Sequence, residues 1–121
     1  MKILFLGDIV GPSGCKVVEK YLKKIVEENK INFVIANGEN AAHNGVGITK
    51  DVLDNLIEFG VNVLTTGNHV WDHKETLKLV EDDNRLLRPF NLIGISPGKG
   101  FEIYQTSKNF KICLLYTSPS P

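Results

Sequence analysis

The sequence predicts an α/β protein built around a parallel sheet, because short apolar runs alternate with segments of helical period. Three runs rich in Ile, Leu, Phe and Val occupy residues 2–6, 32–36 and 61–65. They lack polar alternation, which is typical of strands buried on both faces. The order strand, helix, strand, helix, strand, helix favours parallel strands joined by right-handed crossovers.

Amphipathic helices are expected after each of these strands. In the first helix Ser13 is the expected N-cap, and the apolar residues form one stripe with Lys and Glu opposite: Val17, Val18, Tyr21, Leu22, Ile25 and Val26. The second helix is expected to follow Thr49 and to stop at Gly60, with Val52, Leu53, Leu56 and Ile57 as its stripe. A third, shorter helix is expected to start at Asp72, because Glu75 completes a capping box.

The pattern changes in the last third of the chain. Shorter strands, some of them antiparallel, are expected over residues 91–95, 100–106 and 110–115. Residues 113–121 match one reading frame of a common sequencing adapter. We therefore expect residues 1–112 to be the N-terminal part of one domain and residues 113–121 to be a non-native tail. The alternative is an ordinary Ser/Pro-rich terminus.

The composition narrows the class of protein. Lys+Arg and Asp+Glu both number 14, so the formal net charge is zero. Proteins that hold nucleic acid through its phosphates usually carry a basic excess, so stable nucleic-acid binding is not expected. No apolar run approaches the roughly 20 residues of a membrane span, and the N-terminal run is too short for a secretory signal. With only two cysteines, the expectation is a cytoplasmic protein without membrane association; a homo-oligomer is left open.

A glycine followed by polar side chains ends each of the three predicted strands. These segments read Gly7-Asp8, Gly38-Glu39-Asn40 and Gly67-Asn68-His69. The carboxyl ends of parallel strands face one edge of the sheet, where ligands bind. Glycine lets the chain turn sharply and lets the backbone approach a bound group. We therefore expect these polar side chains to converge.

The residue types in this cluster suit divalent cations. Carboxylate and amide oxygens bind hard cations, and an imidazole extends the range to Mn, Fe or Zn. Two metals about 3.5–4 Å apart can clamp the attacking and leaving oxygens of a phosphoryl group. Asp8, Glu39, Asn40 and Asn68 could supply much of that shell, and His69 is placed to protonate the leaving oxygen. Taken singly, these residues could instead be a cap, a solvated loop and a turn residue.

Other polar residues have simpler interpretations. His43 and His73 are expected at the surface, and the segment Trp71-Asp72 is expected to fix its loop. Arg85 and Arg88 are expected to be solvated charges, with a phosphate contact from Arg88 as the alternative.

Four motifs together resemble the YmdB-type bacterial phosphodiesterases of the calcineurin-like metallophosphoesterase superfamily. They are residues 7–11, 37–42, 45–49 and 66–72, and the likeness extends over about residues 1 to 112. Val10 stands where many metallophosphoesterases have histidine, and Gly38-Glu39-Asn40 stands where they have Gly-Asp. Both departures are features of this subgroup.

The resemblance implies a four-layer α/β/β/α sandwich that holds two divalent metal ions, iron or manganese. It implies hydrolysis of a small phosphodiester, such as a 2′,3′-cyclic nucleotide, by attack of a metal-bound hydroxide. His69 is the implied proton donor and Glu39 the bridging ligand. The implied metal ligands are Asp8, Glu39, Asn40 and Asn68.

The family completes its metal site with histidines from the later half of a chain about twice this long, whereas no histidine here follows residue 73. We therefore expect this polypeptide to comprise the first parallel β-α-β-α-β sheet and a few short strands. Weak metal binding and little or no activity are expected of it alone.

A Rossmann-like nucleotide-binding module without hydrolytic activity is the alternative. The α/β rhythm and the glycine-bearing loop at residues 7–14 support it. Against it, the first strand is not followed by G-x-G-x-x-G, and the chain has no Gly-Lys-Ser/Thr P-loop. A binding loop also has no need of Glu39 and His69.

Overall fold

The computed structural model of the chain describes residues 1–92 and 97–118. Its elements are β1 (Ile3–Asp8), α1 (Gly11–Asn29), β2 (Phe33–Asn37), α2 (Lys50–Phe59), β3 (Val63–Thr65), the 3-10 helix η1 (Asn68–Trp71), α3 (Lys74–Asp82), β4 (Leu86–Leu87), β5 (Phe101–Gln105) and β6 (Lys111–Leu115).

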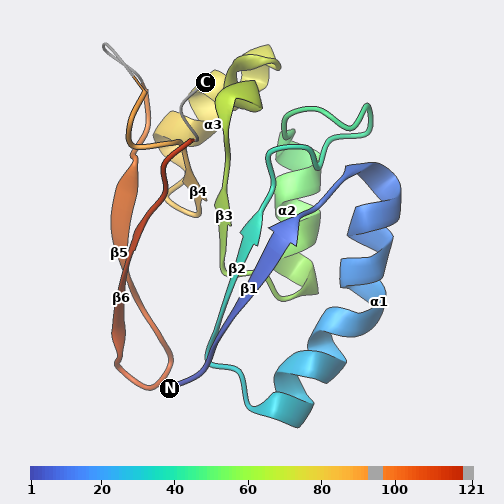
Figure 1. Cartoon of the computed structure of the whole chain (residues 1–121), viewed down its shortest axis with the longest axis vertical. Coiled ribbons are helices and arrows are strands. Elements are labelled where there is room, and N and C mark those ends of the chain that lie inside the picture. The colour runs from blue at the N-terminus through green and yellow to red at the C-terminus, as the bar shows by residue number, and fades with distance from the viewer. Residues whose placement is uncertain (93–96, 119–121) are drawn as a thin grey trace.

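The elements form three layers. Strands β1 to β4 make a parallel sheet in the order β1-β2-β3-β4, and β5 and β6 make an antiparallel pair. Helices α1 and α2 cover one face of the parallel sheet, and the β5–β6 hairpin lies on its other face (Figure 1). The predicted α/β fold around a parallel sheet is confirmed, and so are the strands expected near residues 100–106 and 110–115.

Alternate residues of β2 enter two different cores. Val34 and Ala36 pack with the helices, whereas Phe33 and Ile35 pack with the hairpin. All five residues of β2 are buried. Successive side chains of a strand point to opposite faces, so the hairpin explains why this run lacks polar alternation.

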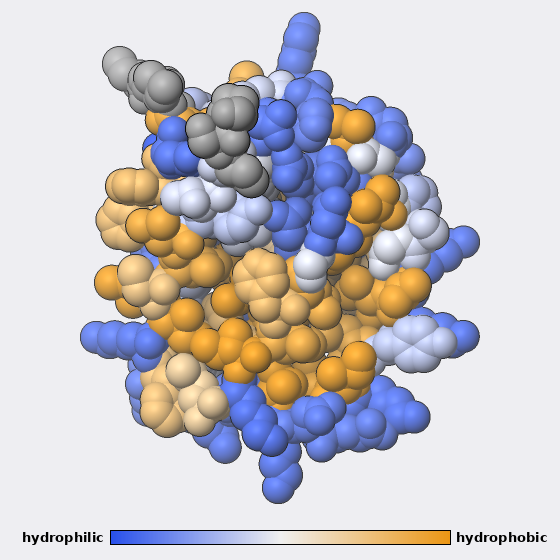
Figure 2. All heavy atoms as spheres, viewed as in Figure 1, coloured by the Kyte–Doolittle hydropathy of each residue, from blue (hydrophilic) through white to orange (hydrophobic). Residues whose placement is uncertain are grey.

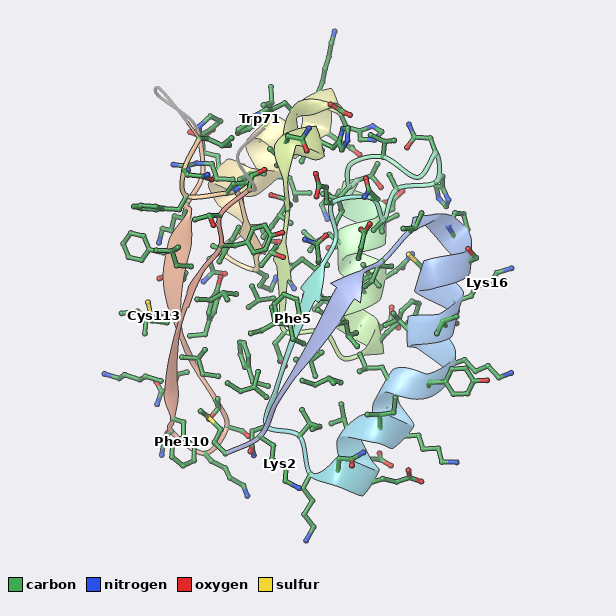
Figure 3. The ribbon with its side chains drawn as sticks, viewed as in Figure 1. Lys2, Phe5, Lys16, Trp71, Phe110 and Cys113 are labelled. Carbon is green, nitrogen blue, oxygen red and sulfur yellow. The ribbon has the colours of Figure 1, made fainter. Side chains whose placement is uncertain are left out.

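The first strand is not buried on both faces, which corrects the expectation for residues 2–6. Ile3 and Phe5 are 45% and 51% exposed, whereas Leu4 and Leu6 pack against the helix-side core. Figure 3 shows Phe5 on the hairpin side of β1. The core between the sheet and the hairpin contains residues of β2, β3 and β4. The hairpin therefore covers these three strands and leaves β1 uncovered. Figure 2 shows the resulting apolar surface beside the hairpin.

Two helices begin differently from the predicted caps. Helix α1 starts at Gly11, so Ser13 lies inside its first turn and is not the cap; Pro12 precedes it, at a position where proline is favoured. Helix α3 starts at Lys74, because Asp72 belongs to the preceding turn. The limits of α2 are as predicted, and Gly60 ends it with a φ of 120°.

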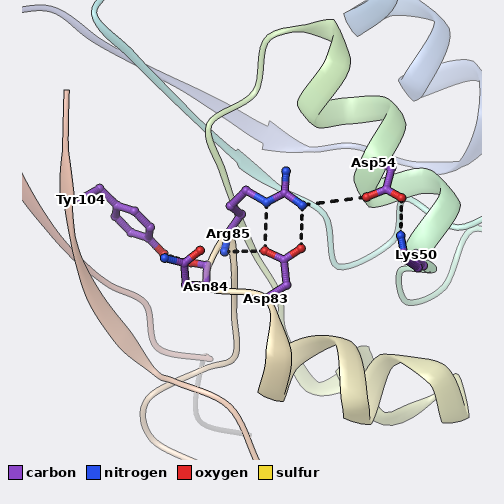
Figure 4. Close-up of polar contacts among 6 residues, drawn as sticks. All are labelled: Lys50, Asp54, Asp83, Asn84, Arg85 and Tyr104. Atoms are coloured by element: carbon purple, nitrogen blue, oxygen red, sulfur yellow. Dashed lines mark hydrogen bonds and ion pairs between the residues drawn. The ribbon is translucent and has the colours of Figure 1, made fainter. Parts of the chain in front are cut away.

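An ionic contact fixes the start of β4. Arg85 donates from Nε and Nη2 to the two carboxylate oxygens of Asp83 at 2.9 and 2.7 Å, and it lies 3.9 Å from Asp54 of α2 (Figure 4). The hydrogen bonds from Arg85 hold the pKa of Asp83 below its usual value. On the other side, the Tyr104 hydroxyl donates to the carbonyl of Asn84 at 2.5 Å. The Arg85 side chain is 40% exposed, as expected of a solvated charge, but it also has a structural role at the start of β4 that was not predicted.

The boundary expected at residue 112 stays a prediction. Residues 113–115 continue β6 and pair with residues 101–103. The strand expected at residues 91–95 lies largely outside the described residues. No helix of the described residues has the length and apolar character needed to cross a membrane.

Two adjacent buried threonines should respond oppositely to loss of their hydroxyls. Thr66 Oγ1 donates to the carbonyl of Leu87 at 2.7 Å, whereas the Thr65 hydroxyl has no partner among the described residues. Both side chains are fully buried, and a buried polar group without a partner costs about 1–3 kcal/mol. We expect Thr65→Val to raise the free energy of unfolding by about 1 kcal/mol and Thr66→Val to lower it by a similar amount. Urea unfolding of both variants measures this; equal losses would contradict it.

Candidate metal site at the carboxyl edge of the sheet

Backbone hydrogen bonds tie together the segments that follow the first strands. The N–H of Ile9 donates to the carbonyl of Asn37 at 3.1 Å, and the N–H of Gly11 donates to that of Asn40 at 2.9 Å. The N–H of Gly38 donates to the carbonyl of Thr65 at 2.8 Å. Strands β1, β2 and β3 run in one direction and end at the same edge (Figure 1), where Figure 2 shows hydrophilic side chains gathered. The predicted strand ends therefore do converge.

Asp8 and Asn40 contact each other directly across this edge. The Asn40 amide nitrogen donates to both carboxylate oxygens of Asp8, at 3.2 and 3.0 Å. Asp8 is brought level with the end of β2 by a register shift between Leu6 and Asp8. The contact orients the Asp8 carboxylate and uses only the nitrogen of the Asn40 amide.

The Glu39 carboxylate lies against the backbone of Gly67, which joins the end of β2 to the end of β3. A Cβ atom on Gly67 would stand only 2.1 Å from Glu39 Cδ and 2.2 and 2.3 Å from its two oxygens. The carboxylate therefore occupies the space that any other residue would fill with its side chain. Asn68, the next residue, begins η1 and is exposed.

Two of the three strand-end glycines, Gly38 and Gly67, are needed for space, and the expectation of a special turn conformation is wrong. None of Gly7, Gly38 and Gly67 adopts a positive φ. A Cβ atom would meet nothing within 4 Å at Gly7, whereas at Gly38 it would stand 2.8 Å from a methyl group of Leu64. Close approach of a functional group is thus found at Gly67, where the group is the Glu39 carboxylate.

His69 is held by an acidic neighbour on the same turn. Its Nδ1 lies 2.8 Å from Oδ2 of Asp72, and because a carboxylate only accepts, Nδ1 carries the hydrogen. This leaves Nε2 as the nitrogen that can face a ligand. The prediction that Asp72 fixes its loop is confirmed. Among the described residues, His69 makes no hydrogen bond to Asp8 or Glu39.

The loop after Asn40 is fastened by His73, a role that the sequence did not indicate. His73 Nε2 donates to the carbonyl of Val46 at 2.9 Å, and its ring fills the space beside Gly47. His73 is half-buried, so the expected surface position is wrong; His43 is exposed, as predicted.

Arg88 is bonded within the protein and is not the predicted solvated charge. Its Nε is also engaged, so this atom cannot make the alternative contact with a phosphate. Its guanidinium donates to the carbonyls of Pro97 and Pro89 at 3.0 and 2.9 Å. The side chain therefore supports the turn after β4.

Asn37 is a further residue of this edge that the sequence reasoning missed. Its side-chain oxygen accepts the N–H of Glu39 at 3.0 Å, and the residue is only 7% exposed. An Asn that bonds to the backbone two residues on is a familiar turn former, so the segment Asn37-Gly38-Glu39 carried a signal for it.

The donor set fits a hard divalent cation. The set depends on amide oxygens as well as carboxylates, because within residues 1–92 and 97–118 no three His, Cys, Asp or Glu side chains lie together as a metal site. Asp8 and Glu39 offer carboxylates and Asn40 and Asn68 offer amide oxygens, which are ligand types of Mg, Ca and Mn. Neither carboxylate forms an ion pair with a Lys or Arg in the described part of the chain. The assignment of these four residues as ligands stays a prediction.

The chain is an α/β protein with a parallel sheet whose carboxyl edge carries acidic and amide side chains, and in open parallel sheets this edge is where ligands commonly bind. The sequence profile of one family matches residues 4–118, and the chain belongs to that family, the YmdB-like proteins.

Relatives of this family resemble the chain in sequence and structure. A Bacillus subtilis (strain 168) protein named 2′,3′-cyclic-nucleotide 2′-phosphodiesterase is 45% identical over 100 residues, which cover 83% of this chain and 38% of that protein. A hypothetical protein from Thermus thermophilus superposes with a TM-score of 0.87 at 36% identity, covering 97% of this chain and 44% of that one. A Mycoplasma pneumoniae phosphatase gives 0.85 at 33% identity, covering 95% and 42%. The chain thus spans less than half the length of these relatives.

Proposed function

We propose that this chain is the metal-binding N-terminal part of a phosphodiesterase that acts on 2′,3′-cyclic nucleotides or related small phosphodiesters. The observation that carries the proposal is the joining of three strand ends through side chains. Asp8 contacts Asn40, and Glu39 lies on Gly67 directly before Asn68.

The names of the relatives support two parts of the proposal, the class of reaction and the substrate. A phosphatase and a phosphodiesterase are among the similar proteins, and both names denote phosphoester hydrolysis. The cyclic-nucleotide substrate rests on the Bacillus subtilis relative. Two divalent ions, iron or manganese, and a cytoplasmic location belong to the proposal as well.

Each residue at the edge has a role in the proposed reaction. Asp8, Glu39, Asn40 and Asn68 would hold the cations, which when bound supply Lewis-acid stabilisation of the phosphoryl oxygens and lower the pKa of water. His69 would give a proton from Nε2 to the departing oxygen. Asp72 holds the His69 ring through Nδ1 and so keeps Nε2 directed outward from that contact.

Removal of the metal tests the proposal. We expect a polypeptide of the relatives' length that begins with residues 1–112 to hydrolyse a 2′,3′-cyclic nucleotide when Mn²⁺ is added. EDTA should abolish hydrolysis and excess Mn²⁺ should restore it, because the carboxylates act through the cation. The 121-residue chain is expected to show little activity in the same assay.

The assay also separates the alternative function. Hydrolysis that survives EDTA would contradict the proposed metal dependence. Metal-free binding of a dinucleotide, without hydrolysis in either polypeptide, would favour the nucleotide-binding module.

A further inference from the structure

Asn37 is a buried polar residue at the end of an otherwise apolar strand. It follows Phe33 and Ile35 on the hairpin side of β2, and both of those residues belong to the core. Burial of an amide is costly unless it is hydrogen-bonded. Its side-chain oxygen meets this requirement by accepting the N–H of Glu39 at 3.0 Å.

Two hydrogen bonds hold the turn that carries Glu39. The Asn37 side chain holds the Glu39 N–H, and the carbonyl of Thr65 in β3 holds the Gly38 N–H at 2.8 Å. Gly38 is also pressed against Leu64, since an added Cβ would stand 2.8 Å from that side chain. The backbone of the turn is therefore fixed on both sides of the Cα atom of Gly38.

The Glu39 side chain itself has no comparable support. Its carboxylate forms no hydrogen bond or ion pair with the described residues and lies on the bare backbone of Gly67. A glutamate side chain loses up to about 2 kcal/mol of rotamer entropy when it is ordered. The placement of the carboxylate therefore depends on the orientation of the Glu39 backbone. The hydrogen bond to Asn37 sets that orientation.

We infer that Asn37 is a positioning residue, which holds the turn so that the Glu39 carboxylate stays over Gly67 and faces the cation site. The metal role of Glu39 in this inference rests on the proposed function. The second hydrogen bond of Asn37, from Nδ2 to the hydroxyl of Tyr116 at 3.3 Å, is not needed for it, because Tyr116 lies in the tail expected to be non-native.

The test compares Asn37 with a matched asparagine in the full 121-residue chain. Asn62 Oδ1 accepts the N–H of Val34 at 2.8 Å; this is also a bond from a backbone N–H to an asparagine side-chain oxygen, but it joins two strands at the opposite end of the sheet. Asn37→Ala, Asn37→Asp and Asn62→Ala would be labelled with ¹⁵N. Amide hydrogen exchange of Glu39 would be measured, followed by titration with Mn²⁺ and observation of paramagnetic line broadening at Asp8, Glu39 and Gly67.

Asn37→Ala should speed exchange of the Glu39 amide and weaken Mn²⁺ binding by roughly tenfold or more, the usual effect of losing a residue that orients a ligand. Asn62→Ala should leave both unchanged. Asn37→Asp keeps an acceptor oxygen and should restore slow exchange at Glu39, a readout that its added charge does not mimic. If Asn37→Ala does not fold, Asn37→Leu has a similar size, lacks the acceptor and suits the apolar side of β2.

Slow Glu39 exchange in Asn37→Ala, or Mn²⁺ affinity equal to that of Asn62→Ala, would overturn the inference. A different result would contradict the proposed function instead: no Mn²⁺-dependent broadening at these residues in the unsubstituted polypeptide of the relatives' length, which the weak binding expected of the 121-residue chain does not explain. In that case the exchange rates still decide whether Asn37 holds the turn.

Discussion

Gly67→Ala is expected to weaken Mn²⁺ binding by about 10- to 100-fold while leaving the fold intact. The methyl group would stand 2.1–2.3 Å from the Glu39 carboxylate, which must move away. The backbone can accept alanine, since Gly67 has φ −141° and ψ −151°, in the extended region. The clash involves only the end of a flexible side chain, so the free energy of unfolding should change by less than about 1 kcal/mol.

Gly7→Ala is the matched control for this variant. Gly7 occupies the equivalent position before Asp8, at the end of β1, and an added Cβ meets nothing within 4 Å. Mn²⁺ titration by line broadening and thermal unfolding of both variants measure the two effects. Equal Mn²⁺ affinity in the two variants would show that the position of the Glu39 carboxylate does not matter for the cation.

The convergence of the strand ends could be predicted because it follows from chain direction alone. Once three apolar runs are assigned to parallel strands, Asp8, Glu39 and Asn68 must fall at one edge of the sheet. The contact of Asn40 with Asp8 is a consequence of this placement. No knowledge of side-chain packing was required.

Features that depend on neighbouring layers could not be predicted in the same way. Phe5 has the apolar character of a buried strand residue, yet it is exposed because the hairpin covers β2 to β4 and not β1. The contacts of Arg85 and His73 were not predicted because their partners, Asp83 and the carbonyl of Val46, do not follow from a helical or strand period.

The role of Gly67 shows the same limit at the site itself. A glycine before a polar residue suggested a tight turn, but its φ is that of any extended residue. What requires glycine is a carboxylate from another strand end, that of Glu39 after β2. Such a requirement is visible only when both segments are placed in space.

Glu39→Gln should lower turnover by about 10³-fold, or roughly 4 kcal/mol of transition-state stabilisation, in the polypeptide of the relatives' length. Glutamine keeps the size and the packing on Gly67 but removes the charge and one of the two equivalent oxygens that a bridging ligand needs. The measurement is kcat for a 2′,3′-cyclic nucleotide with saturating Mn²⁺. Glu75→Gln serves as the control, because Glu75 is an exposed acid that accepts the N–H of Lys50 on the other side of the loop.

The combination of Glu39→Gln with Gly67→Ala separates the site from a general loss of structure. Both substitutions act through one carboxylate, so the double variant should be little worse than the more damaged single variant. Additive losses in the logarithm of kcat/KM would mean that Gly67→Ala damages something other than Glu39. Full turnover of Glu39→Gln would refute the bridging role, whatever the result at Gly67.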